Sequence, residues 1–139
     1  MNRIDNTHQQ MIFDTSYFDK KIEKQINEAV GKSFSFKERC RLKGIGSKRL
    51  TITNISEEYR KYLNAEHYQS KANIELRPKG IIVHFRHKLQ AYCWIMPFSD
   101  LEIKNEKKLS LASNGKFIDF IEQLEESFLE KINSTKAAS

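Results

Sequence analysis

The sequence has little cysteine, proline or glycine, with two Cys, two Pro and five Gly among 139 residues. The two cysteines, Cys40 and Cys93, are too few for a disulfide framework, and neither has a second Cys in Cys-x-x-Cys spacing. The scarcity of Pro and Gly excludes collagen-like and low-complexity chains. No window approaches the roughly 20 apolar residues of a membrane-spanning helix, and the first residues lack the apolar run of a secretory signal. We therefore expect a folded chain with reduced cysteines, and the cytoplasm is the expected compartment.

The apolar content is sufficient for one core. Hydrophobic residues make up 39% of the chain, charged residues make up 30%, and there are nine Phe. A chain of 139 residues fits one ordinary domain, which buries roughly two-thirds of the surface that its unfolded form exposes. We expect a single domain over residues 1–139 that needs neither disulfides nor a structural metal.

Two segments have the apolar spacing of amphipathic helices. In residues 16–30, Ser16 and Asp19 form a capping-box pattern and Gly31 marks the stop. We predict a helix over residues 16–30, a second helix over residues 116–132 and a disordered polar tail over residues 133–139. The apolar stripe of the second helix comprises Phe117, Ile118, Phe120, Ile121, Leu124, Phe128, Leu129 and Ile132.

Between these helices the period of the pattern changes to two. In Phe34–Lys43 apolar residues alternate with cations, and Leu50–Thr53 follows a turn at Gly44–Ser47, which predicts a basic hairpin. A short helix is expected from Ser56, and further strands at residues 73–77, 81–87, 89–96, 101–104 and 109–112. Because the connections are too short for parallel crossovers, the sheet of residues 34–112 should be antiparallel. The predicted fold class is α+β, a seven-stranded roll or partly open barrel with an N-terminal helix and a long C-terminal capping helix.

Two segments resemble small bacterial pleckstrin-homology-like (PH-like) domains. One is Pro78–Ile82, where Gly-Ile-Ile opens a strand, and the other is Trp94–Ile103, where Ile-Met-Pro-Phe-Ser-Asp-Leu connects two strands. The resemblance covers about residues 34–132. It implies two orthogonal sheets closed at one end by a C-terminal helix. It implies a fold more than an activity, because most of these bacterial domains have no known ligand.

The chain departs from this family before and within the sheet. The helix at residues 16–30 precedes the family's first strand, and the short helix from Ser56 is an insertion in a loop. In lipid-binding members the headgroup motif lies in the first hairpin. Here Lys43 and Lys48 fit that motif, but Leu50 stands where an arginine is required, so the motif is incomplete.

Charge is segregated along the chain. There are 24 Lys plus Arg against 18 Asp plus Glu, a net charge of +6. Residues 37–49 contain six cations and one anion (+5), residues 77–88 four cations and no anion (+4), and residues 119–131 five anions and one cation (−4). The alternative to a binding site is a solvated sheet face whose cations prevent edge pairing. The expected anion-binding residues are Lys37, Arg39, Arg41, Lys43, Lys48, Arg49, Arg86 and Lys88.

Tyr92 and Trp94 share one face of the strand at residues 89–96. If that face is exposed they form a partner surface, and if both faces are covered they belong to the core. His84 and His87 lie three residues apart, which on a strand sends them to opposite faces, so no metal site is expected. The sequence has no nucleophile motif and no phosphate or dinucleotide loop, so neither catalysis nor a cofactor is expected.

These observations lead to one expectation with two alternatives. We expect a non-catalytic PH-like binding domain that meets an anionic partner, a lipid headgroup or an acidic protein, through the basic hairpin. One alternative is a nucleic-acid-binding protein that uses the same basic face. The other is a protein-interaction or self-assembly module that uses Tyr92, Trp94 and the first helix.

Overall fold

The structure, a computed structural model, describes residues 11–63 and 70–139. This part of the chain forms eight antiparallel strands, three α-helices and two 3-10 helices, which confirms the α+β class and replaces the seven expected strands by eight. The strands are β1 (Ile12–Asp14), β2 (Leu50–Ile55), β3 (Lys71–Arg77), β4 (Gly80–His87), β5 (Gln90–Pro97), β6 (Leu101–Asn105), β7 (Leu109–Ser113) and β8 (Lys116–Phe120). The helices are α2 (Lys20–Val30), α3 (Phe36–Leu42), η1 (Glu57–Tyr62), η2 (Phe98–Asp100) and α4 (Glu126–Ala138). None of the helices in the described residues has the length and apolar character to span a membrane.

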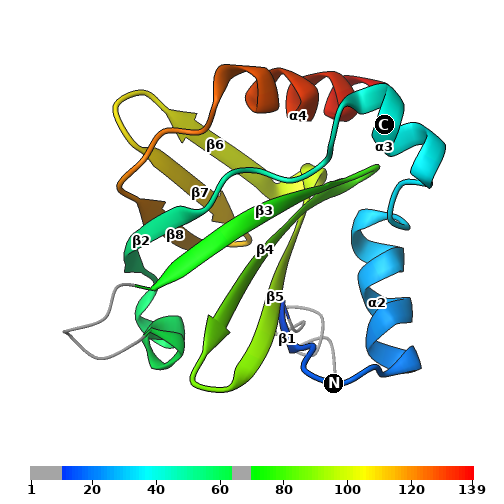
Figure 1. Cartoon of the computed structure of the whole chain (residues 1–139). Helices are drawn as coiled ribbons and strands as arrows, with labels where there is room; N and C mark the ends of the chain where they lie inside the picture. The colour runs from blue at the N-terminus through cyan, green and yellow to red at the C-terminus, as the bar shows by residue number, and fades with distance from the viewer. Residues whose placement is uncertain (1–10, 64–69) are drawn as a thin grey trace.

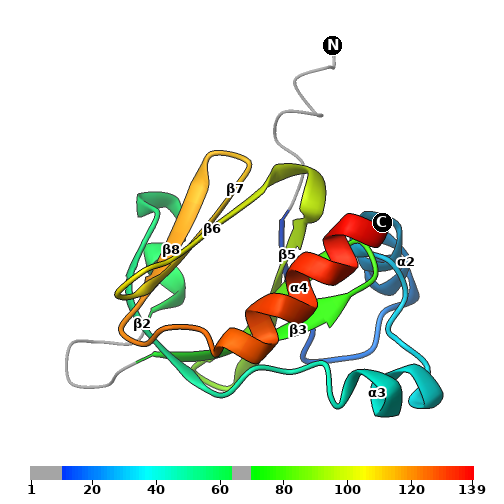
Figure 2. The same cartoon turned by 90° about the horizontal axis from the view of Figure 1, so that it is seen from above.

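The sheet curls into a roll. Its strands are hydrogen-bonded in the order β1-β5-β4-β3-β2-β8-β7-β6. Strand β2 links the two halves, because Leu50 and Thr51 pair with β3 while Ile52–Ile55 pair with β8. Figure 1 shows β3, β4 and β5 on one side and β6, β7 and β8 on the other. Helix α4 lies across one end of the roll, as the view from above confirms (Figure 2).

The inner faces of the strands form an apolar core. Trp94 of β5 and Phe120 of β8 are fully buried there, and Phe128 of α4 joins the same cluster. At the end of the roll away from α4 (Figure 1), Tyr59 of η1 sets its ring edge-on to Trp94, with the ring centroids 4.9 Å apart. The roll is therefore covered by a helix at each end, and the core lies between them.

Helix α2 covers part of the outer face of the sheet. It begins after Asp19, whose carboxylate accepts hydrogen bonds from the backbone N–H groups of Lys21 and Ile22, and it ends at Gly31, where φ is 87°. The predicted stop is confirmed, but the predicted start at residue 16 is four residues too early. The apolar residues that pack between α2 and the sheet are Phe13, Ile26, Val30, Ile82, Cys93 and Ile95.

The two segments that resemble PH-like domains meet at one corner of the roll. Gly80 is paired with Pro97 across β4 and β5, and the backbone N–H of Phe98 donates to the Lys79 carbonyl over 2.9 Å. The N–H of Lys79 donates in turn to the carbonyl of Val30 at the end of α2, over 2.8 Å. Because three segments of the chain approach so closely there, Gly80 has no room for a side chain.

The segment Phe34–Lys43 is a helix and not the predicted strand, so the basic hairpin does not exist. Ser35 caps α3 by accepting a hydrogen bond from the Glu38 N–H, and the Glu38 carboxylate accepts one from the Ser35 N–H, which is a complete capping box. No residue of α3 is buried, and Phe36 is 81% exposed. The alternating pattern was misleading because its apolar residues do not share one environment. Phe34 is buried in the core and Leu42 packs against it, whereas Phe36 and Cys40 are exposed.

The predicted helix over residues 116–132 is also wrong in its first half. Asn114 and Gly115 both have positive φ, 52° and 77°, and this two-residue turn returns the chain as strand β8. Ile118 and Phe120 of β8 are fully buried, and their spacing of two residues was hidden within the apolar stripe. The helix starts only at Glu126 and continues to Ala138, through the segment expected to be disordered.

The remaining predicted elements agree with the structure. The strands expected at residues 73–77, 81–87, 89–96, 101–104 and 109–112 are confirmed as β3 to β7, within two residues at each end. The short helix expected from Ser56 is η1. Strand β1 was not predicted, and its three residues pair with β5 at the edge of the sheet.

We predict that Gly80→Ala lowers the free energy of unfolding by about 1–3 kcal/mol, the usual cost of overpacking. A Cβ at this position would lie 2.5 Å from the Met96 carbonyl oxygen and 2.8 Å from Val30 Cγ1. The matched control is Gly46→Ala, where the nearest atom is 3.9 Å away and the change should stay within about 0.5 kcal/mol. Urea unfolding of both variants measures the difference, and equal stability of the two would contradict the close-packed corner.

Candidate functional site

The eight residues expected to bind anions do not form one surface. Lys37, Arg39 and Arg41 lie on α3 and Lys43 is its C-cap, whereas Arg86 and Lys88 lie at the β4–β5 turn. Figure 1 shows α3 and this turn at opposite ends of the molecule. Lys48 is exposed and pairs with Glu125 over 3.2 Å. From separate parts of the sequence, the structure brings Arg49 and Arg86 into one groove, which is described below.

The outer face of β3, β4 and β5 carries two kinds of side chain. Near α2, Ile82 is aligned with Ile95, and both are buried under the helix. Farther along the strands, Asn73, His84 and Cys93 form one row across the sheet, and Arg86 is aligned with Ala91 in the next. The face therefore changes from apolar to polar and cationic in the direction of the β4–β5 turn.

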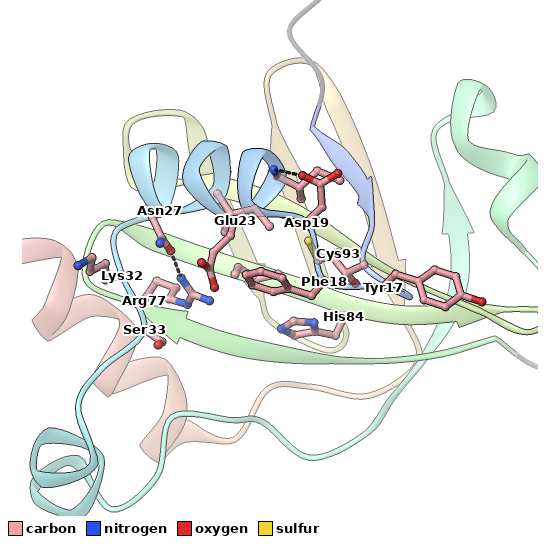
Figure 3. Close-up of a pocket in the computed structure, with 14 residues that line it drawn as sticks. Tyr17, Phe18, Asp19, Glu23, Asn27, Lys32, Ser33, Arg77, His84 and Cys93 are labelled. Atoms are coloured by element: carbon pink, nitrogen blue, oxygen red, sulfur yellow. Dashed lines mark hydrogen bonds between the residues drawn. The ribbon is translucent and has the colours of Figure 1, made fainter.

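A first groove lies between α2 and this outer face (Figure 3). Its volume is about 460 Å³, and its floor includes Ile22, Ile26, Ile82 and Cys93. Phe18 belongs to its wall and is 73% exposed, and Figure 3 shows the Phe18 ring close to His84. The remaining lining residues are polar or charged: Thr15, Tyr17, Asp19, Glu23, Asn27, Lys32, Ser33 and Arg77.

Glu75 organises the charges beside this groove. Its carboxylate accepts a hydrogen bond from Arg77 Nε over 2.6 Å, and its other oxygen lies 2.7 Å from His84 Nε2. Arg77 also donates through Nη1 to the Gly31 carbonyl, over 2.8 Å, and to the Asn27 side chain, over 3.2 Å. One guanidinium thus ties the C-terminal end of α2 to the sheet.

The environment shifts the pKa values of two groups at this site. Desolvation raises the pKa of the Glu75 carboxyl, but the hydrogen bonds from His84 and Arg77 and their charges outweigh it, so the pKa is lowered overall. Burial raises the pKa of the Cys93 thiol to about 11. At neutral pH the thiol is therefore protonated, and Cys93 acts as an apolar wall of the groove and not as a nucleophile.

A second groove of about 470 Å³ adjoins the first on the cationic part of the outer face. Arg49, Lys71 and Arg86 line it, and none of its lining residues within the described chain is acidic. Lys71 Nζ donates to Thr51 Oγ1 over 2.8 Å, which holds the ammonium group in place. Thr15 and His84 line both grooves, so the two are continuous along the sheet.

The turn between β4 and β5 presents an apolar tip that the sequence patterns did not single out. Leu89 is 90% exposed, and it follows Lys88, which has a positive φ of 58°. Tyr17 is 87% exposed beside this turn, because its neighbour Ser16 accepts a hydrogen bond from the Ala91 N–H over 2.9 Å. The sequence feature that could have predicted this tip is an apolar residue, Leu89, in a two-residue turn, where burial is not expected.

Tyr92 and Trp94 do not form an exposed partner surface. Trp94 has no exposed area and lies in the core, so its assignment to a surface was wrong. Tyr92 is partly buried, stacks on Phe85 with the centroids 5.5 Å apart and borders the second groove. Both faces of β5 are covered, one by the core and one by α2, so of the two readings left open by the sequence the core reading holds.

Within residues 11–63 and 70–139, no three His, Cys, Asp or Glu side chains come close enough to hold a metal ion. Comparisons with protein-family models, with curated proteins and with solved structures found no match to this chain. The outer face of the sheet has two adjoining grooves, and the β4–β5 turn beside it exposes two cations and Leu89. Grooves and exposed apolar residues are both features of binding surfaces.

We predict that Glu75→Gln lowers the free energy of unfolding at pH 7 by about 1.5–3 kcal/mol, the range for hydrogen bonds to charged groups. The folded pKa of Glu75 is lowered from a usual value of 4.5, so its stabilisation is complete above that value and is lost as the pH falls through the folded pKa. The difference between wild type and variant should therefore shrink in acid. Urea unfolding between pH 3 and about 7 measures it.

The matched control is Glu102→Gln, at an exposed position on β6. This variant should follow the wild-type pH profile. A Glu75→Gln variant that is as stable as wild type at neutral pH would show that the carboxylate does not hold Arg77 and His84 together.

Proposed function

We propose that the protein is a non-catalytic binding module that docks on an anionic membrane surface through the β4–β5 turn. The observation that carries the proposal is Leu89, which is 90% exposed at the tip of a turn whose neighbouring residues include Arg86 and Lys88. An exposed apolar tip flanked by cations suits a surface that is negatively charged outside and apolar inside. Anionic lipids give the cytoplasmic leaflet this character, and the cytoplasm remains the expected compartment.

The energetics of such docking are favourable. Burial of a leucine side chain contributes about 1.5–3 kcal/mol, and each Lys or Arg near an anionic leaflet contributes about 1 kcal/mol. Tyr17, which is 87% exposed beside the turn, adds an aromatic ring suited to the interface between lipid headgroups and acyl chains. The acidic residues of the segment 119–131 do not lie on this turn.

Two features support a PH-like architecture for this module. Strands β2 to β8 are seven antiparallel strands in succession, followed by one α-helix that lies across an end of the roll. The two sequence segments that resemble the family meet at the Gly80–Pro97 corner. Helix α2 and strand β1 are additions to that architecture, and α2 forms one wall of the first groove.

We predict that Leu89→Glu reduces binding to vesicles containing phosphatidylserine by at least about tenfold, because it replaces the burial of an apolar side chain by an additional negative charge. Co-sedimentation with these vesicles and with phosphatidylcholine vesicles measures the effect. The matched control is Phe36→Glu, which makes the same kind of change at an 81% exposed position on α3. Equal loss of binding in both variants would contradict docking through the turn.

A second pair of variants tests the orientation by charge. Arg86→Glu with Lys88→Glu should weaken vesicle binding by at least about 30-fold, which corresponds to the loss of two cations at about 1 kcal/mol each. Lys37→Glu with Arg41→Glu changes the net charge equally but lies on α3, and it should have a much smaller effect. Polynucleotide binding that depends on the α3 pair would favour the nucleic-acid alternative.

A further inference from the structure

We infer that the two continuous grooves on the outer face form one site for a single-chain anionic amphiphile, such as an alkyl phosphate or a fatty acid. The anionic head would lie in the second groove, between Arg49 and Arg86, and the alkyl chain would lie in the first groove, beside α2. This site goes beyond membrane docking, because it takes one molecule from solution on a surface that does not include Leu89.

The head end has cationic donors and no acidic residue among the described residues that line it, while Glu122, whose charge acts on Lys71, is hydrogen-bonded to Thr51. Arg49 and Arg86 form no salt bridge with any other residue that the structure describes, and the Lys71 ammonium group of the same groove donates to Thr51 Oγ1. A guanidinium group binds carboxylate or phosphate through two parallel hydrogen bonds. Asn73 lines the same groove and adds an amide donor.

The chain end has an apolar floor and an uncommitted aromatic side chain. Ile22, Ile26 and Ile82 line it, and the Cys93 thiol there is neutral because its pKa is raised to about 11. Phe18 is 73% exposed at the groove wall (Figure 3), and an alkyl chain beneath it would cover this ring. Such burial contributes about 25 cal/mol per Å² of apolar surface.

Electrostatics set the direction of the ligand. Two acids, Asp19 and Glu23, and two cations, Lys32 and Arg77, line the first groove, whereas cations alone charge the lining of the second, so an anionic head favours the second groove. Glu75, in the strand row of Ile82, is hydrogen-bonded to Arg77 and His84 and therefore leaves no unpaired carboxylate beside the first groove. The grooves have volumes of about 460 and 470 Å³, each within the range of roughly 300–1,000 Å³ that is typical of small-molecule sites.

The test is isothermal titration calorimetry of the full chain with butyl, octyl and dodecyl phosphate, each titrated below its micelle concentration, with a second dodecyl phosphate titration above it. If the chain enters the groove, affinity should rise by about tenfold for every two added methylene groups, at about 0.8 kcal/mol each. Equal affinity for butyl and dodecyl phosphate would overturn the inference and leave only an anion site. Binding that appears only above the micelle concentration would also overturn it, although membrane docking would stand.

Variants locate the two ends of the ligand. Arg49→Gln should weaken the binding of all three phosphates by a similar factor, whereas Phe18→Ser should weaken dodecyl phosphate and leave butyl phosphate unchanged. Leu89→Glu should leave the titrations unchanged while it reduces vesicle binding, so the two proposals fail separately. The matched controls are Lys37→Gln and Phe36→Ser on α3, and if either removes dodecyl phosphate binding the assigned groove is wrong.

Discussion

The outer face of strand β4 carries apolar residues, such as Ile82, that the core inside the roll cannot cover. Residues Gly80–Val83 are buried on both faces of the sheet, whereas Arg86 is exposed. The covering helix α2 has 11 residues, about 16 Å at 1.5 Å per residue, and the eight residues of β4 extend about 26 Å. The helix is too short for the strand. The uncovered part of the outer face therefore becomes the cationic groove, and the β4–β5 turn projects beyond it.

The position of α2 depends on a few polar contacts at the other end of the strand. Arg77, held by Glu75, binds the carbonyl of Gly31, and the Lys79 N–H binds that of Val30. These contacts fix the helix end over the apolar rows, and the N-terminal end of α2 lies toward His84. Apolar and cationic parts of one face are thus placed side by side. The proposed binding of an amphiphilic or membrane ligand rests on this juxtaposition, whereas the cations of α3 lie on a helix with no buried residue.

Sequence patterns predicted the elements whose signals are local. Strands β3 to β7 were found because period-two apolar patterns were separated by turn residues such as Pro78–Gly80 and Lys88. The capping box of Ser35 and Glu38 was overlooked in favour of an alternating pattern, and β8 was hidden in a helical stripe. The grooves could not be predicted, because they depend on which face of β4 receives α2 and on how far that helix reaches. Arg49 and Arg86 were expected to act with a basic hairpin that does not form, and the structure places both in one groove on the outer face.

The most direct test is a map of backbone amide chemical shifts of the isotope-labelled full chain during titration with anionic bicelles. We expect the shifts to change at residues 15–22 and 84–91, on the outer face and the β4–β5 turn. The amides of α3 should keep their positions. Changes confined to Phe36–Leu42, with the outer face unaffected, would contradict the account, because they would place binding on the solvated helix.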